Sequence, residues 1–286
     1  MTPLLDIQNL NKSYPTFALK DVSFSLPQGY IMGFIGPNGA GKTTTIKAVL
    51  NMIHADSGVV EILGRRGDEV IDLKEQLGVV MDLPFYVDAW RCRDVEAAVH
   101  PFYRRWDSPR FAKLLKQFGI DPSKRVKELS RGMKVKLMMA VALSHHARLL
   151  LLDEPTSGLD PVAREELLDI LAEFMQDENN GVLFSTHITA DLEKVADYIT
   201  FILNGQIIFT GLKDALLESY ALVKGGPKDL TERSRKALLG LRSHATGFEG
   251  IIRTADMALL PAAALVEPAS LEQLIVFLNQ EGKKDV

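Results

Sequence analysis

The sequence has a single cysteine, Cys92, among its 286 residues, so no disulfide can form within the chain. One free thiol is typical of proteins in a reducing compartment. The sequence also lacks a run of about 18 apolar residues, the length that a membrane-spanning helix needs. Its first ten residues, MTPLLDIQNL, lack the basic region and the apolar stretch of a secretory signal. We therefore expect a cytoplasmic protein that does not cross a membrane by itself.

An excess of basic charge is also missing. The 33 Lys and Arg residues are outnumbered by 37 Asp and Glu residues, which gives a formal net charge of -4. Without a global positive field, we expect no nucleic-acid partner. The hydrophobic share of 47% and the charged share of 24% are those of a folded globular protein. The length favours one large domain with an appendix.

The clearest chemical motif is GPNGAGKTT at residues 36–44, which fits the P-loop pattern G-x-x-x-x-G-K-[ST]. An apolar, strand-like run at residues 30–35 precedes it, and a helix-like segment follows it. The glycines of such a loop let backbone N–H groups turn onto phosphates, and Lys42 would add a positive charge at the β and γ phosphates. Thr43 would offer its hydroxyl to Mg²⁺. The motif predicts a nucleotide phosphate site.

A second motif, RLLLLDEP at residues 148–155, is an apolar run that ends in two carboxylates. Buried parallel strands have such continuous apolar runs, and ligands gather at their carboxyl ends. We expect Asp153 to reach the Mg²⁺ shell through water and Glu154 to orient and polarise the attacking water. The alternative for Glu154 is that it only caps the following loop.

A third motif, ELSRGMK at residues 128–134, precedes the helix-like run VKLMMAVAL. Ser130 stands where a helix N-cap would stand, and Gly132 allows a close backbone approach. The N-terminus of a helix attracts anions. The segment therefore predicts an anion site.

Together these motifs resemble the ATP-binding subunits of ATP-binding cassette (ABC) transporters, over about residues 4–210. GPNGAGKTT is similar to the Walker A motif of that family, and LLLLDE is similar to Walker B with its catalytic glutamate. SGLD at residues 157–160 resembles the D-loop. His187 resembles the switch histidine that contacts the γ-phosphate, and Tyr14 stands where the family stacks an aromatic ring on adenine.

The resemblance implies ATP and Mg²⁺ as cofactors and assigns a role to each matching residue. The implied catalytic residues are Glu154, His187 and Lys42. The implied nucleotide-binding residues are Tyr14, Gly36, Asn38, Gly39, Ala40, Gly41, Lys42, Thr43, Thr44, Ser130, Gly132 and Asp160. The implied metal-site residues are Thr43, Asp153 and Asp82.

ELSRGMK resembles the LSGGQ signature of the family, which in the assembled protein faces the γ-phosphate held by the P-loop of another subunit. Arg131 and Met133 replace a glycine and the glutamine of that signature. The LSRGM form is similar to that of bacterial ABC-2-type exporters. Arg131 could help to hold the triphosphate or could simply be solvated. Asp82 stands where the family has the Q-loop glutamine, and it could hold a metal-bound water or be a plain turn residue.

The expected fold class is α/β: a P-loop NTPase core with a parallel sheet, an antiparallel β subdomain, an inserted helical lobe and a small α+β C-terminal appendix. We expect the ATPase domain at residues 1–211, with the helical lobe at about 83–146, and the appendix at 212–286. In the appendix, Leu271, Leu274, Ile275 and Leu278 share one face of a predicted helix. The expected strands are 4–10, 22–26, 30–35, 59–63, 78–81, 149–152, 182–185, 198–203 and 206–210.

The function that the resemblance implies is an ATP-hydrolysing subunit that dimerises around two ATP molecules and powers export through a separate transmembrane permease subunit. The second ATPase subunit would be an identical chain or a paralogue, and the complex would lie at the cytoplasmic face of the cell membrane. An importer ATPase is the nearest alternative. A soluble ABC ATPase acting on DNA or ribosomes is another, although this chain has one cassette and no sustained heptads. A module that binds ATP without turnover is less compatible with Glu154 and His187.

Overall fold

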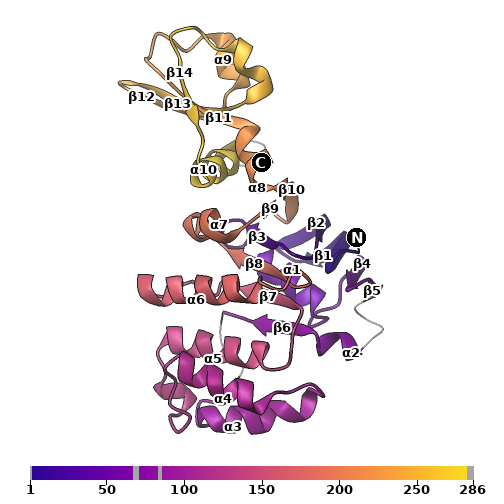
Figure 1. Cartoon of the computed structure of the whole chain (residues 1–286). Helices are drawn as coiled ribbons and strands as arrows, with labels where there is room; N and C mark the ends of the chain where they lie inside the picture. The colour runs from indigo at the N-terminus through magenta and orange to yellow at the C-terminus, as the bar shows by residue number, and fades with distance from the viewer. Residues whose placement is uncertain (1, 67–70, 83–85, 282–286) are drawn as a thin grey trace.

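The computed structural model describes residues 2–66, 71–82 and 86–281 (Figure 1). These residues form three β-sheets and a helical lobe. Figure 1 shows the helical lobe at one end, a large central sheet in the middle and the C-terminal sheet at the other end. This arrangement confirms the predicted fold class.

The central sheet has six strands in the order β10-β9-β3-β8-β7-β6. Five are parallel, and β10 pairs antiparallel with β9 at one edge. In β7, Leu150 and Leu152 belong to the hydrophobic cluster on one face, whereas Leu149 and Leu151 belong to the cluster on the other. Because both faces of the sheet are covered at β7, the four leucines of this strand form an unbroken apolar run. The strands are β3 Ile31–Ile35, β6 Leu77–Val80, β7 Leu149–Asp153, β8 Gly181–Thr186, β9 Tyr198–Leu203 and β10 Gln206–Leu212.

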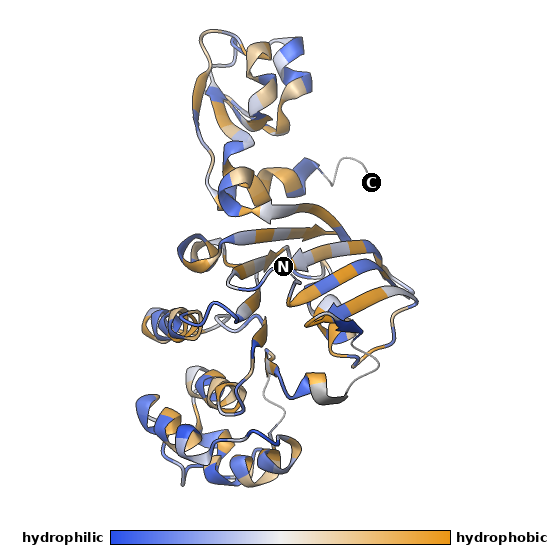
Figure 2. Ribbon diagram, turned by 45° about the vertical axis from the view of Figure 1, so that its right-hand side comes forward, coloured by the Kyte–Doolittle hydropathy of each residue, from blue (hydrophilic) through white to orange (hydrophobic). Residues whose placement is uncertain are grey.

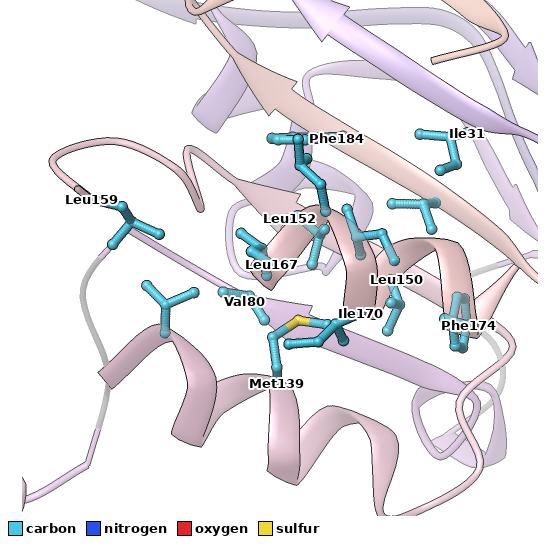
Figure 3. Close-up of a cluster of buried hydrophobic side chains, with 14 of the residues drawn as sticks. Ile31, Val80, Met139, Leu150, Leu152, Leu159, Leu167, Ile170, Phe174 and Phe184 are labelled. Atoms are coloured by element: carbon cyan, nitrogen blue, oxygen red, sulfur yellow. The ribbon is translucent and has the colours of Figure 1, made fainter. Parts of the chain in front are cut away.

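The helix α6, Pro161–Phe174, covers one of these faces. Figure 3 shows Leu167, Ile170 and Phe174 of this helix against Leu150 and Leu152. The helix α1, Lys42–Val49, follows the P-loop, and its Ile46 and Val49 belong to the opposite cluster. The two helices thus fix the sheet from both sides.

The second sheet is antiparallel, in the order β2-β1-β4-β5. Its strands are β1 Leu5–Tyr14, β2 Phe17–Leu26, β4 Ser57–Ile62 and β5 Arg65–Arg66. Hydrophilic and hydrophobic residues alternate along parts of these strands (Figure 2), as expected of a sheet with one face in solvent. The predicted strands 4–10 and 22–26 were too short, because the β1–β2 pairing continues through half-exposed residues to the pair Tyr14 and Phe17.

The helical lobe lies between β6 and β7 in the chain. Its helices are α3 Cys92–Val99, α4 Ser108–Gln117 and α5 Arg131–Leu143, with 3-10 turns at His100–Phe102 and Val126–Glu128. The short helix α2, Ile71–Lys74, precedes β6. The predicted first residues of the lobe, 83–85 with Phe85, lie outside the described residues. Within the described part of the chain, no helix is both long and apolar enough to cross a membrane.

The C-terminal appendix contains an antiparallel sheet in the order β12-β13-β11-β14. Its helix α10, Leu271–Glu281, packs against α7, Thr189–Val195, in the core. Leu271 and Leu274, two of the residues predicted to share one face, are buried, and Phe277 is buried with them. Ile275 and Leu278 are only partly buried. The other elements are α8 Lys213–Glu218, β11 Tyr220–Gly225, α9 Glu232–Ala237, β12 Leu239–His244, β13 Gly247–Arg253, a 3-10 turn at Thr254–Leu259 and β14 Leu265–Pro268.

Candidate functional site

The P-loop connects the end of β3 to the start of α1. Gly36 leaves no room for a side chain, since a Cβ there would lie 2.3 Å from the carbonyl oxygen of Ile202. Gly39 has a φ of 81°, and nothing lies within 4 Å of the position where its Cβ would be. Asn38 and Gly39 are exposed at the tip of the loop, and Ala40 and Gly41 are buried. The loop is therefore fixed at its base and open at its tip, as a phosphate cradle requires.

Lys42, the first residue of α1, is nearly buried. Its Nζ donates to the carbonyl oxygen of Gly36 at 2.7 Å and to that of Pro37 at 3.3 Å. The ammonium group thus lies over the inside of its own loop, where the phosphates of a nucleotide would lie.

A buried carboxylate stands beside α1, at the end of β7. Thr43 Oγ1 donates to Asp153 Oδ2 at 2.8 Å, and Ser185 Oγ donates to Asp153 Oδ1 at 3.0 Å. Burial raises the pKa of Asp153 above its ordinary value in spite of these two hydrogen bonds. The sequence reasoning missed Ser185, although its place in FSTH two residues before His187 was a signal. The register that pairs β7 with β8 places it opposite Asp153.

Glu154 follows β7 with a φ of 51°, in the left-handed region that few non-glycine residues adopt. Its Oε2 lies 2.7 Å from His187 Nδ1, and its Oε1 lies 3.1 Å from Lys42 Nζ. Oε1 is buried, and among the described residues it has an ion pair but no hydrogen bond of good geometry. The structure therefore brings together all three residues predicted as catalytic, and it leaves one carboxylate oxygen able to accept a further hydrogen bond.

The donor set of the site fits a magnesium ion. Thr43 and Asp153 supply a hydroxyl and a carboxylate, which are the hard oxygen ligands that Mg²⁺ prefers. The described residues contain no group of three or more His, Cys, Asp or Glu side chains placed to hold a metal. Mg²⁺ is usually held by one or two carboxylates together with substrate phosphates and water, so this small set agrees with that chemistry.

Tyr14 lies at the end of β1, opposite Phe17 of β2. Tyr14 is 43% exposed, and Lys12 Nζ lies 5.6 Å from the centroid of its ring. A Cβ on Gly41 of the P-loop would lie 3.0 Å from Phe17 Cζ. Phe17, which sequence reasoning did not single out, therefore lies against the loop itself.

The signature segment begins α5. Ser130 is the N-cap that the sequence predicts, because its Oγ accepts a hydrogen bond from the Met133 N–H at 3.2 Å. Gly132 packs on the neighbouring helix, since a Cβ there would lie 3.3 Å from Ala163 Cβ. Asp160 has a similar capping position on that helix, α6, and its Oδ1 accepts from the N–H groups of Val162 and Ala163 at 3.0 Å.

Asp82, predicted as a metal-site residue, has another partner in the structure. Its Oδ1 accepts a hydrogen bond from Arg131 Nη2 in the signature segment. Thr44, predicted to bind nucleotide, is half-buried in the first turn of α1.

Comparisons with known proteins agree with this geometry. A family model described as "ABC transporter" matches residues 19–157. The lantibiotic transport ATP-binding protein SrtF of Streptococcus pyogenes is 34% identical over 208 residues, which are 72% of this chain and 89% of that protein. The chain belongs to the ATP-binding proteins of ABC transporters. It is therefore an ATPase whose ATP hydrolysis is coupled to transport.

An import protein and a solved structure are also similar to this ABC transporter ATPase. The phosphonates import ATP-binding protein PhnC of Treponema denticola is 31% identical over 235 residues, which are 74% of this chain and 91% of that protein. A solved structure described as the ATP-binding subunit of an ABC transporter is 29% identical, with a TM-score of 0.68 over 74% of this chain and 91% of that one. Tyr14 and His187 lie outside residues 19–157, so the match to the family model does not include them.

Proposed function

We propose that this chain hydrolyses ATP with Glu154 as the residue that polarises the attacking water. The observation that carries the proposal is the position of the Glu154 carboxylate between Lys42 and His187. Lys42 would leave the Gly36 carbonyl and bind the β and γ phosphates, where its charge is needed. Its departure would free Glu154 Oε1 to accept a hydrogen bond from water, while His187 would contact the γ-phosphate.

We assign the Mg²⁺ to Thr43 and Asp153. The ion would neutralise charge that develops on the phosphates. It would also favour the ionised form of Asp153, which burial disfavours in the chain alone. The same proposal places adenine on the exposed ring of Tyr14. The role of Asp82 in the metal site stays a prediction.

The signature segment of one chain would complete the site of a second chain. The Ser130 side chain is exposed, as is Arg131 after it, so the start of α5 is accessible to a ligand from outside. The N-terminus of this 13-residue helix suits a phosphate. Two chains would therefore enclose two ATP molecules, each between one P-loop and one signature.

A mixing experiment tests this composite site. Lys42→Ala would damage the cradle, and Ser130→Arg would crowd the signature, so each homodimer should be inactive. A heterodimer would contain one site with both defects and one with neither, so activity should reappear in the mixture at well below the wild-type rate. If the mixture stays inactive while mass spectrometry shows that heterodimers formed, each chain uses its own signature and the proposal is wrong.

We further propose that the ATPase powers export through a separate membrane subunit at the cytoplasmic face of the membrane. The support is the LSRGM signature with Arg131 and the acid at Asp82, both of which resemble ABC-2-type exporters. PhnC, a relative of similar identity, is an import protein, so import is the alternative.

Direction can be measured on the membrane complex that co-purifies with the tagged chain. In proteoliposomes with ATP outside, the outer solution corresponds to the cytoplasm. Fractions of cell extract would be added either outside or inside the vesicles, and ATP hydrolysis would be followed. Export predicts stimulation by a fraction on the ATP side, because cargo must bind on the side that it leaves. Stimulation only from the opposite side would indicate import.

A further inference from the structure

The two residues that depart from the usual family pattern, Arg131 and Asp82, are bound to each other. Arg131 is the first residue of α5, and Asp82 lies two residues beyond the end of β6. Arg131 Nη2 donates to Asp82 Oδ1. The stem of Arg131 also lies on Gly158, where a Cβ would be 3.2 Å from both Arg131 Cδ and Nε. One side chain therefore connects the signature, the end of β6 and the loop that precedes α6.

This contact lies at one end of the contact between α5 and β6. At the other end, a Cβ on Gly78 of β6 would lie 2.9 Å from Ala142 Cβ of α5. Between these ends, Val80 and Met139 belong to the same hydrophobic cluster, and Figure 3 shows them facing each other. Apolar packing thus fixes the body of α5, and the ion pair adds a polar contact at the start of the helix.

The charges of the two residues explain why they occur together. The N-terminus of a helix carries partial positive charge, so an arginine at its first position is electrostatically unfavourable. The Asp82 carboxylate supplies the opposite charge at that place. Both side chains are about half exposed, 44% for Arg131 and 51% for Asp82, and so exposed a pair adds little to overall stability. Its effect is on the direction in which the helix start points.

A shift of that start would not stay local. Gly132 lies against Ala163 and Leu159, so α5 and the start of α6 are in close contact. The start of α6 is capped by Asp160 in the loop that also contains Gly158. Movement of Arg131 would therefore change the position and orientation of Ser130 and Gly132.

We propose that Arg131 is a positioning residue which, held by Asp82 and Gly158 of its own chain, sets the orientation of the signature segment. Asp82 acts through Arg131. The inference rests on the proposed composite site, because the orientation of α5 matters for turnover only if its start faces a nucleotide. It predicts that the charges can be exchanged between the two positions, whereas a metal role for Asp82 or a phosphate role for Arg131 predicts that they cannot.

The experiment compares the full chain with Asp82→Arg, Arg131→Asp and the exchanged double variant. Each single variant should lower kcat roughly 3- to 10-fold, because it places two like charges side by side, and leave the KM for ATP within about two-fold. The double variant should recover most of the kcat that the single variants lose, although not all of it, because an aspartate at position 131 cannot reproduce the contact of the Arg131 stem with Gly158. Arg131→Lys should retain part of the activity, and Lys127→Ala, an exposed cation three residues before Ser130, is the control for loss of charge.

A second readout needs no ATP. Spin labels on cysteines at exposed Lys113 of α4 and exposed Lys20 of β2 would report the distance between the helical lobe and the antiparallel sheet, and the native Cys92 is buried. The distance distribution should broaden or shift in each single variant and return in the double variant. A wild-type distance distribution in the double variant would support the positioning role of the Arg131–Asp82 pair even if the wild-type chain had no ATPase activity. Lack of activity would refute only the proposed function.

Three outcomes would overturn the inference. The first is a double variant that recovers neither kcat nor the distance distribution. The second is a rise in the KM for ATP of Arg131→Ala by tenfold or more, which would place Arg131 on the nucleotide. The third is a comparable rise in the Mg²⁺ requirement of Asp82→Ala, with Arg131→Ala unaffected, which would return Asp82 to the metal site.

Discussion

The P-loop region and the signature segment differ in how their polar groups are satisfied. In the P-loop region, Glu154 contacts both Lys42 and His187. The Lys42 and Glu154 side chains are only 6% and 14% exposed, whereas that of His187 is 42% exposed. In the signature segment, Ser130 and Arg131 are exposed, and the Ser130 Oγ accepts a bond only from its own helix among the described residues. Both regions include a loop that begins a helix, but only in the first are charged side chains, those of Lys42 and Glu154, buried by their own chain.

The difference indicates that the two segments have different tasks. An enclosed set of charges can be positioned in advance for catalysis, since neighbouring groups hold each of them. An exposed helix start can receive a group from another molecule. Substitutions in the first region should therefore affect chemistry strongly, and those in the second should affect the isolated chain weakly.

The largest effect is expected for Glu154→Gln. The amide keeps the shape of the side chain but loses the charge that polarises water, so kcat should fall about 100-fold or more. ATP should still bind, and dimers should accumulate with it. Steady-state hydrolysis and gel filtration with ATP are the measurements, with Glu178→Gln in an exposed loop as the control. A variant that retains more than about a tenth of the wild-type rate would contradict the assignment.

The next prediction concerns pH: in acid, the helical lobe should lose stability before the P-loop region does. His145 follows α5 and is buried, its Nδ1 lies 3.0 Å from the Glu75 carbonyl oxygen, and its ring stacks on Tyr103. Burial lowers the pKa of His145 from 6.5 to about 4. Between about pH 4 and pH 6.5, His145 therefore binds a proton in the unfolded chain but not in the folded chain. Stability should fall as pH drops from about 6.5 to about 4, by at most about 3 kcal/mol at 1.36 kcal/mol per pKa unit.

Urea unfolding between pH 4 and 7 measures this fall. His145→Gln should remove most of the slope, and His54→Gln, at an exposed position, should keep it. Hydrogen exchange at pH 5 should show the helical lobe opening before the P-loop region. Equal opening of both regions would show that acid does not act through His145.

Lys42→Ala should weaken nucleotide binding by roughly 10- to 100-fold, because a charge-assisted hydrogen bond is worth about 1.5–3 kcal/mol. Titration calorimetry with a non-hydrolysable ATP analogue and Mg²⁺ measures the affinity. Lys47→Ala changes another lysine of the same helix, α1, and should bind normally. Unchanged affinity in Lys42→Ala would place the phosphates elsewhere.

The smallest effect is expected for Ser130→Ala in the isolated chain. Loss of the N-cap should lower the free energy of unfolding by about 1 kcal/mol. Ser130→Thr keeps the hydroxyl and should lose less. Chemical denaturation measures both, and no difference between Ser130→Ala and wild type would mean that the cap is absent in solution. If Ser130→Ala lowered the free energy of unfolding of the isolated chain more than Lys42→Ala does, the contrast between the two segments would be reversed.

Much of the fold could be predicted from the sequence because it depends on local patterns. The apolar run before Asp153 and the apolar run before the P-loop each indicate a strand, and both strands are present. The strands of the antiparallel sheet were predicted too short, because their outer parts depend on cross-strand partners such as Tyr14 and Phe17. The α+β character of the appendix was predicted, but its individual strands were not, since the pairing of β11 with β13 and β14 joins segments far apart in the chain.

The sequence by itself determined the phosphate loop, the two carboxylates at the end of β7 and the N-cap at Ser130, because each depends on neighbours within a few residues. Only the tertiary structure decided that Glu154 lies between Lys42 and His187, since those residues come from three different segments. It also decided that Asp82 binds Arg131, 49 residues later in the chain. The physical reason is that a charge selects its partner by distance in space, and only folding sets that distance.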